Sequence, residues 1–325
     1  MSARALTYPL RVIRARTRSL INRLLHDYEV RRGSKLAARD DRAPIFVISP
    51  PRSGSTLFFQ LLVETFDIGW LANAHLEWHG GASVIERRRH PRDARTRSDF
   101  TSRHGDTEAA WEPSEGAGFW YRFFPKDPDR NELLAEDATP QRVGALRAAV
   151  RLLADACNGP VFFKNSLNTL RLPVIREALP EARYIHLSRD LEVNARSLLA
   201  GRIANGDVNA WWSATPRGAE AHDHETPAEQ VVWQVQRINE VAREQLALVA
   251  DANHMSATYE ELVTDPRGTM DRVEAFLRAS GVPVTRRADP NIPERFEQRA
   301  GGTLAPELEE QLRAAVTASH GRVDG

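Results

Sequence analysis

The sequence predicts an α/β fold of three layers, in which a central parallel sheet is covered by helices on both faces. Three runs are predicted as strands, at residues 45–48, 161–164 and 183–187, and the first has the continuous hydrophobicity of a strand that is buried on both sides. The first and third of these runs are followed by a polar turn and then by apolar residues at helical spacing. Strands that alternate with helices in this way favour parallel pairing through helical crossovers.

The turn after the first strand has the composition of an anion-binding loop. Its backbone N–H groups and hydroxyls would point at the start of a helix, whose dipole favours negative charge, and they come from Ser53, Gly54, Ser55 and Thr56. Gly54 would let the backbone approach a ligand closely, and Arg52 adds a permanent positive charge. The alternative interpretation is that this strand, turn and helix are rich in serine and glycine by chance and bind no ligand.

The Walker loop of nucleotide triphosphatases, G-x-x-x-x-G-K-[ST], is the obvious comparison for this turn. This chain has Ser49 in place of the first glycine and Ser55 in place of the lysine. The loop therefore keeps a phosphate cradle, but its cation has moved upstream to Arg52.

Two later strands also end in basic residues. A helix that begins at Thr139 and Pro140 leads to the strand at 161–164, which ends in Lys164. A lysine at the end of a buried strand needs an anionic partner unless it reaches solvent. The strand at 183–187 is followed by Arg189, and Ser197 lies about two helical turns further on, so both could face one phosphate group.

The C-terminal part of the sequence continues the alternation. A capping box at Thr226 begins a helix, residues 254–259 form the next strand, and a helix from Asp265 ends near Gly281. The polar segment 205–226 between them is long enough for a lid or an acceptor loop.

Together these motifs resemble the PAPS-dependent sulfotransferases, in particular the bacterial type with its P-loop-like fold. Residues 51–56 match the 5′-phosphosulfate loop, P-[RK]-S-G-[ST]-T. Arg189 and Ser197 match the 3′-phosphate motif R-D-P…S, although Leu191 replaces its proline. Lys164 and Tyr259 match a family lysine and the tyrosine of Y-E-[DE]-L, and the resemblance spans about residues 45–303.

The resemblance implies transfer of the sulfuryl group of PAPS (3′-phosphoadenosine 5′-phosphosulfate) to a hydroxyl or amine of an acceptor, with release of PAP and without a metal ion. Lys164 and Arg52 would stabilise charge on the leaving phosphate oxygen. The cofactor-binding residues that it implies are Arg52, Ser53, Gly54, Ser55, Thr56, Arg189, Ser197 and Tyr259. A carbohydrate, a lipid, a peptide and a small phenol all remain open as acceptors. A P-loop kinase or nucleotide triphosphatase and a non-catalytic PAP-binding protein are the alternative functions.

A further strand is predicted at residues 68–71, and the general base is expected just past it, where the tyrosylprotein and bacterial sulfotransferases that this chain resembles place acidic residues. Glu77 is the first candidate, because a partly buried carboxylate can have its pKa raised toward neutrality. His75 and His79 are close rivals, and Glu112 and Glu115 remain possible from an aromatic segment at 111–124.

Composition limits the other classes of function. The 325 residues carry 44 basic and 44 acidic side chains, so no overall charge indicates a nucleic acid partner. The single cysteine, Cys157, excludes an internal disulfide framework and favours a reducing compartment. No stretch has the length of a transmembrane helix or the pattern of a signal peptide, so a cytoplasmic location is expected, with peripheral membrane contact as an option.

The predicted organisation is a single domain at 44–325, with acceptor-side insertions near 72–138 and 203–227, preceded by an arm at 1–43. The first 44 residues contain 11 basic and 4 acidic side chains, a net charge of +7. An apolar stripe runs through this basic segment at Leu10, Ile13, Leu20, Ile21, Leu24 and Leu25. We expect a basic amphipathic helix over residues 1 to about 40 that contacts a membrane surface, its own domain or the partner in a homodimer.

Overall fold

The fold is described by a computed structural model that covers residues 3–89, 98–101, 107–126 and 131–320. Its centre is a five-stranded sheet with the order β3-β4-β1-β5-β6, in which every pair is parallel. The strands of this sheet are β1 (Ile45–Ile48), β3 (Gly69–Trp70), β4 (Val161–Lys164), β5 (Arg183–Ser188) and β6 (His254–Thr258). A second, antiparallel sheet has two strands, β2 (Phe66–Asp67) and β7 (Thr285–Arg286).

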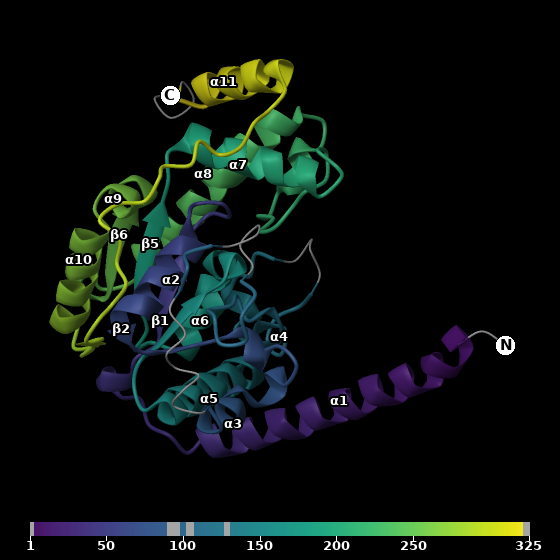
Figure 1. Cartoon of the computed structure of the whole chain (residues 1–325), viewed down its shortest axis with the longest axis vertical. Coiled ribbons are helices and arrows are strands. Elements are labelled where there is room, and N and C mark those ends of the chain that lie inside the picture. Colours follow the sequence, from purple (N-terminus) through teal and green to yellow (C-terminus); the bar gives the residue numbers. More distant parts are fainter. Residues whose placement is uncertain (1–2, 90–97, 102–106, 127–130, 321–325) are drawn as a thin grey trace.

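Helices cover both faces of the main sheet (Figure 1), which confirms the predicted α/β class. The described helices are α1 (Ala3–Gly33), α2 (Ser55–Thr65), α3 (Ala82–Arg87), α4 (Ala117–Trp120), α5 (Pro140–Cys157), α6 (Leu172–Ala178), α7 (Leu191–Ala204), α8 (Pro227–Leu246), α9 (Tyr259–Thr264), α10 (Pro266–Ala279) and α11 (Pro306–His320). None of them combines the length and the hydropathy that crossing a bilayer requires.

Strand β1 is buried on both sides because its alternate residues enter two different cores. Phe46 and Ile48 pack with residues of α5 and α6, whereas Ile45 and Val47 pack with residues of α2 and α10. This is why the strand is apolar at all four positions.

The strand order places β1 between β4 and β5, so three chain segments leave the sheet side by side. Val47 lies in register with Lys164 on β4, and Ile48 lies in register with His186 on β5. In a parallel sheet the carboxyl ends of the strands share one edge. The chain connects β1 to neighbours on its two sides, and a crevice forms at this edge where the order of the strands reverses. The segments after β1, β4, β5 and β6 therefore meet there.

The structure also shows where the sequence patterns were incomplete. Helix α11 was not predicted, and it packs on α7 and α8 through Leu312 and Val316.

The predicted capping box of α8 is present, with Thr226 Oγ1 accepting from the Glu229 N–H. Of the predicted insertion at 72–138, residues 90–97, 102–106 and 127–130 lie outside the described part.

Candidate active site

The loop between β1 and α2 approaches the rest of the site at Gly54. Gly54 has a φ of 86°, and a Cβ at this position would lie 2.3 Å from the ring of Tyr259. Both the left-handed backbone and the close approach therefore require glycine. Helix α2 begins at Ser55, directly after this loop, so its first N–H groups lie at the crevice edge.

Three arginine side chains gather beside this loop. The Arg52 Nε–H donates to Ser197 Oγ at 3.3 Å, and an Arg189 Nη1–H donates to the Arg52 carbonyl at 3.0 Å. The Arg189 guanidinium also donates to the Arg299 carbonyl and lies 4.1 Å from the centre of the Tyr259 ring.

These arginines lack acidic partners. Burial lowers the pKa of Arg52, and the positive charges of Arg189 and Arg299 lower it further. Within the described residues, none of the three forms an ion pair with a carboxylate. Arg52 and Arg189 are partly buried, and Glu260 and Asp190 act on Arg189 without forming an ion pair, so an anion bound among the arginines would offset their mutual repulsion. The cluster therefore has the chemistry of a phosphate site.

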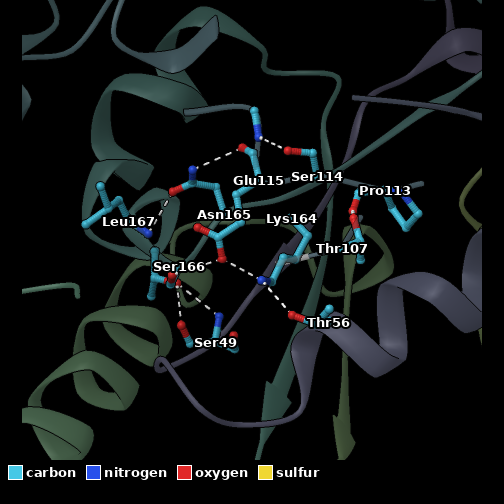
Figure 2. A network of polar contacts seen from close by, with 12 residues as sticks. Ser49, Thr56, Thr107, Pro113, Ser114, Glu115, Lys164, Asn165, Ser166 and Leu167 are labelled. Atoms are coloured by element: carbon cyan, nitrogen blue, oxygen red, sulfur yellow. Dashed lines mark hydrogen bonds and ion pairs between the residues drawn. The ribbon is translucent and has the colours of Figure 1, made fainter. Parts of the chain in front are cut away.

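A second polar cluster lies at the end of β4 (Figure 2). Lys164 is 6% exposed, and its ammonium donates to Thr56 Oγ1 at 3.0 Å and to Glu115 Oε1 at 2.5 Å. The Ser166 hydroxyl donates to the same carboxylate oxygen at 3.3 Å. The cluster thus joins the anion loop, β4 and the segment that precedes α4.

Glu115 is held in place through its backbone. Its carbonyl oxygen accepts from Trp120 Nε1 and from Asn165 Nδ2, each at 3.1 Å. Gly116, with a φ of 62°, turns the chain directly after it. Its other carboxylate oxygen, Oε2, has no hydrogen-bond partner among the residues described.

Both clusters line one cavity of about 630 Å³. It contains seven of the predicted cofactor-binding residues and Lys164: Arg52, Gly54, Ser55, Thr56, Arg189, Ser197, Tyr259 and Lys164. Ser53 is fully buried and does not line the cavity, and its hydroxyl has no partner in the described structure. Ser53 can therefore contribute only through its backbone.

Glu77 lies elsewhere. Its carboxylate is 3.9 Å from Arg18 and its side chain is 60% exposed, while its carbonyl oxygen accepts from Asn22 on α1. The strand end that was expected to deliver Glu77 to the cavity instead leads into a segment that packs against α1. Of the five candidates for the base, only Glu115 lines the cavity.

The other candidates have structural partners. His75 is 2% exposed, with Nδ1 accepting from the Ala72 N–H at 2.9 Å and Nε2 lying 3.5 Å from Glu86. Glu112 accepts from backbone N–H groups three and four residues upstream. His79 packs against the position of Gly118, and burial lowers its pKa.

Several cavity residues were not predicted as ligands. Phe296, Arg299 and the pair Gly301 and Gly302 come from a C-terminal segment whose sequence gave only a weak glycine signal. Phe296 is fixed beside α9 because its N–H donates to the Val263 carbonyl at 2.8 Å. Trp212 comes from the predicted lid segment at 205–226, and its ring would contact any Cβ at Gly201.

Comparison with known proteins agrees with this geometry. A sequence model of the sulfotransferase family matches residues 44–284, so the chain belongs to the sulfotransferase family. Sulfotransferase STF1 from Mycobacterium tuberculosis has a similar fold, with a TM-score of 0.53, 16% identity and coverage of 91% of this chain and 77% of that one. Sulfotransferase STF9 from Mycobacterium avium gives a TM-score of 0.52, 15% identity and coverage of 90% and 72%. No curated protein matches the sequence significantly.

Membership of this family makes the chain a sulfotransferase, and the P-loop-like expectation for its fold is confirmed. Among the residues described, no group of three or more histidine, cysteine or acidic side chains has the arrangement of a metal site.

Proposed function

We propose that this sulfotransferase uses PAPS as the donor and transfers its sulfuryl group to a hydroxyl or amine. One observation carries the proposal. A cluster of arginines that forms no ion pair within the described residues lines the same cavity as the Lys164–Glu115 pair, and both contact the anion loop. A nucleotide with separate 3′ and 5′ anionic groups fits such a division, whereas ATP carries its phosphates in one chain.

The 5′ side of the donor is assigned to the loop. The N–H groups of Gly54, Ser55 and Thr56 at the start of α2 would bind its phosphate, with the helix dipole adding to the attraction. Leu57 and Phe296 line the cavity, and the Phe296 ring would offer a surface on which a nucleobase stacks.

The 3′-phosphate is assigned to the arginine cluster. Arg189 and Ser197 come from the strand end and the helix that follows, as expected, and Arg52 reaches them from the loop. Arg299 and the glycine pair at 301–302 line the same part of the cavity: the Arg299 carbonyl accepts from Arg189, and a Cβ at Gly301 would lie 3.2 Å from the Ser197 nitrogen. Charge-assisted hydrogen bonds from several guanidiniums would give the site its preference for a doubly charged phosphate.

Bound PAPS would supply an activated sulfuryl group on a good leaving group. The acceptor oxygen forms a new bond to sulfur, the bond from sulfur to the phosphate oxygen breaks, and its electron pair stays on that oxygen. Lys164 donates to Thr56, which belongs to the loop assigned to the 5′-phosphate, so its ammonium is suited to stabilising this negative charge.

The proton of the acceptor must leave as the new bond forms, and the proposed base is Glu115. Its Oε1 is occupied by Lys164 and Ser166, which leaves Oε2 to accept the proton from the acceptor hydroxyl. A small molecule, a carbohydrate or a lipid would enter past Trp212 and Ser213, from the lid segment.

Ligand binding tests the donor without knowledge of the acceptor. PAP should raise the melting temperature of the protein, whereas ATP with magnesium should raise it far less, because binding to the folded state stabilises it by mass action. Arg189→Ala should weaken PAP by roughly 1.5–3 kcal/mol, since a charge-assisted contact is lost. Arg243→Ala, an exposed arginine on α8, is the matched control and should leave PAP affinity unchanged. Equal PAP affinity in wild type and Arg189→Ala would refute the 3′-phosphate assignment, and a preference for ATP with magnesium would favour a kinase or triphosphatase.

A further inference from the structure

The C-terminal half of α1 is firmly attached to the domain. Asn22 accepts from the Gly80 N–H at 2.7 Å and donates to the Glu77 carbonyl at 3.0 Å. Glu29 is fully buried, and it accepts from Ser83 Oγ at 2.6 Å and from Arg122 at 2.7 Å. This face of the helix is therefore already occupied by its own domain.

The N-terminal half of α1 extends away from the body of the protein (Figure 1). All side chains at residues 14–20 are exposed. An isolated helix has little stability without tertiary packing or a binding partner, so a projecting segment of this length suggests a surface to which it binds.

The free face of the attached half is apolar. Leu20, Leu24 and Tyr28 are 56%, 59% and 41% exposed, and they make up half of the large exposed hydrophobic residues in the described structure. At about 100° per residue, their spacing of four places them on the side of the helix opposite Asn22 and Glu29. The exposed stripe is thus separate from the face that packs on the domain.

Positive charge surrounds this stripe. The sequence from residue 1 to 26 contains six arginines and no acidic residue. Arg14, Arg16 and Arg23 are exposed and make no ion pair with a described residue, and Arg18 lies no closer than 3.9 Å to Glu77. Upstream of Leu20, apolar residues recur at positions 6, 10 and 13, and Thr17 interrupts their spacing of three or four residues.

The stripe could contact either a second copy of the chain or a lipid surface, and the surrounding charges favour the lipid surface. A second copy of the chain would bring an identical set of arginines against this one, and their mutual repulsion would oppose a symmetric pair. An anionic lipid surface is complementary to both properties, because it accepts apolar side chains at the acyl boundary and attracts arginines at the headgroups. We propose that the stripe formed by Leu20, Leu24 and Tyr28, together with the flanking arginines, docks α1 on an anionic membrane.

Flotation with vesicles tests this on the full-length protein. The protein should bind vesicles that contain phosphatidylglycerol and should not bind vesicles of phosphatidylcholine alone. Leu20→Gln with Leu24→Gln should weaken binding at least tenfold, because two exposed apolar side chains no longer insert. Leu248→Gln is the matched control, since this leucine is 65% exposed on another part of the surface.

The charge contribution is tested separately. Arg14→Gln with Arg16→Gln should weaken binding about 30-fold, at about 1 kcal/mol for each arginine near an anionic surface. Arg278→Gln, on α10, should change nothing. PAP binding should be unaffected in all variants, so this result is independent of the proposed donor.

Two outcomes would overturn the proposal. One is unchanged vesicle binding in the Leu20→Gln, Leu24→Gln variant. The other is a wild-type protein that is dimeric by light scattering and becomes monomeric with the same two substitutions, which would assign the stripe to a homodimer.

Discussion

The Lys164 ammonium lies 2.5 Å from Glu115 Oε1, although 49 residues separate them in the chain. Lys164 ends a buried strand of the sheet, and Glu115 lies in a loop whose backbone is held by Trp120 and Asn165. The contact brings the residue that would stabilise the leaving oxygen next to the residue that would accept the proton. A substitution of Lys164 should therefore slow the departure of the leaving oxygen, and a substitution of Glu115 should slow removal of the acceptor proton.

Glu115→Gln should lower kcat by about 10² to 10⁴, because an amide cannot take the acceptor proton. PAP affinity should stay close to that of wild type, since the amide keeps the shape of the side chain and Glu115 is not among the residues assigned to the phosphates. The measurement is PAP release with an accepted substrate, together with calorimetric titration of PAP. Glu77→Gln and Glu112→Gln serve as controls because neither carboxylate lines the cavity. A full rate for Glu115→Gln would remove it from the mechanism.

Lys164→Ala should lower turnover far more than it weakens PAP binding. Charge on the bridging oxygen develops only as the bond to sulfur breaks, so the ammonium stabilises the transition state more than the ground state. Comparing kcat with the Kd for PAP separates the two effects. Equal losses in both would make Lys164 an ordinary phosphate ligand.

Gly54→Ala should destabilise the loop and weaken PAP binding together. The added Cβ would meet the Tyr259 ring at 2.3 Å, and alanine at a φ of 86° is strained by about 1–3 kcal/mol. Gly144→Ala provides the matched control within α5, where nothing lies within 4 Å of the new Cβ. That substitution should stabilise the protein by roughly 0.5–1 kcal/mol. Chemical denaturation measures the free energy of unfolding of both variants. A Gly54→Ala variant as stable as wild type would argue against a rigid loop.

The strand at 45–48 was predictable because it is apolar throughout, and the strands at 161–164 and 183–188 because each carries apolar residues and leads to a basic residue, Lys164 or Arg189. The anion loop, Lys164 and Arg189 follow directly from those ends, since parallel strands deliver their carboxyl ends to one edge. The base was harder to place, because Glu77 and Glu115 both lie in segments without periodicity. The backbone contacts of Glu115 with nearby Trp120 and with Asn165, which is 50 residues away, hold its carboxylate in the cavity. The segment 295–303 resembles the C-terminal loop of the family only in part, so Phe296 and Arg299 could not be assigned as ligands from sequence; their positions depend on contacts with α9.

The attachment of α1 should depend on pH through His26. Its Nδ1 accepts from the Arg122 Nε–H at 3.0 Å, and this contact requires the neutral imidazole. Burial, and secondly the charge of Arg122, lower the pKa of His26 below its usual value of 6.5. The unfolded chain therefore binds a proton at a higher pH than the folded protein does. This contribution to stability is complete above about pH 6.5 and is lost as the pH falls toward the lower folded pKa.

The melting temperature should accordingly fall as the pH drops below about 6.5, and His26→Gln should reduce the steepness of that fall. Glutamine cannot titrate, and its side-chain oxygen can still accept from Arg122. His224→Gln, in the loop before α8, is the control and should retain the wild-type profile. Because His186 also has a pKa lowered by burial, part of the slope should remain in the His26 variant. An unchanged slope in His26→Gln would show that this histidine does not couple protonation to folding.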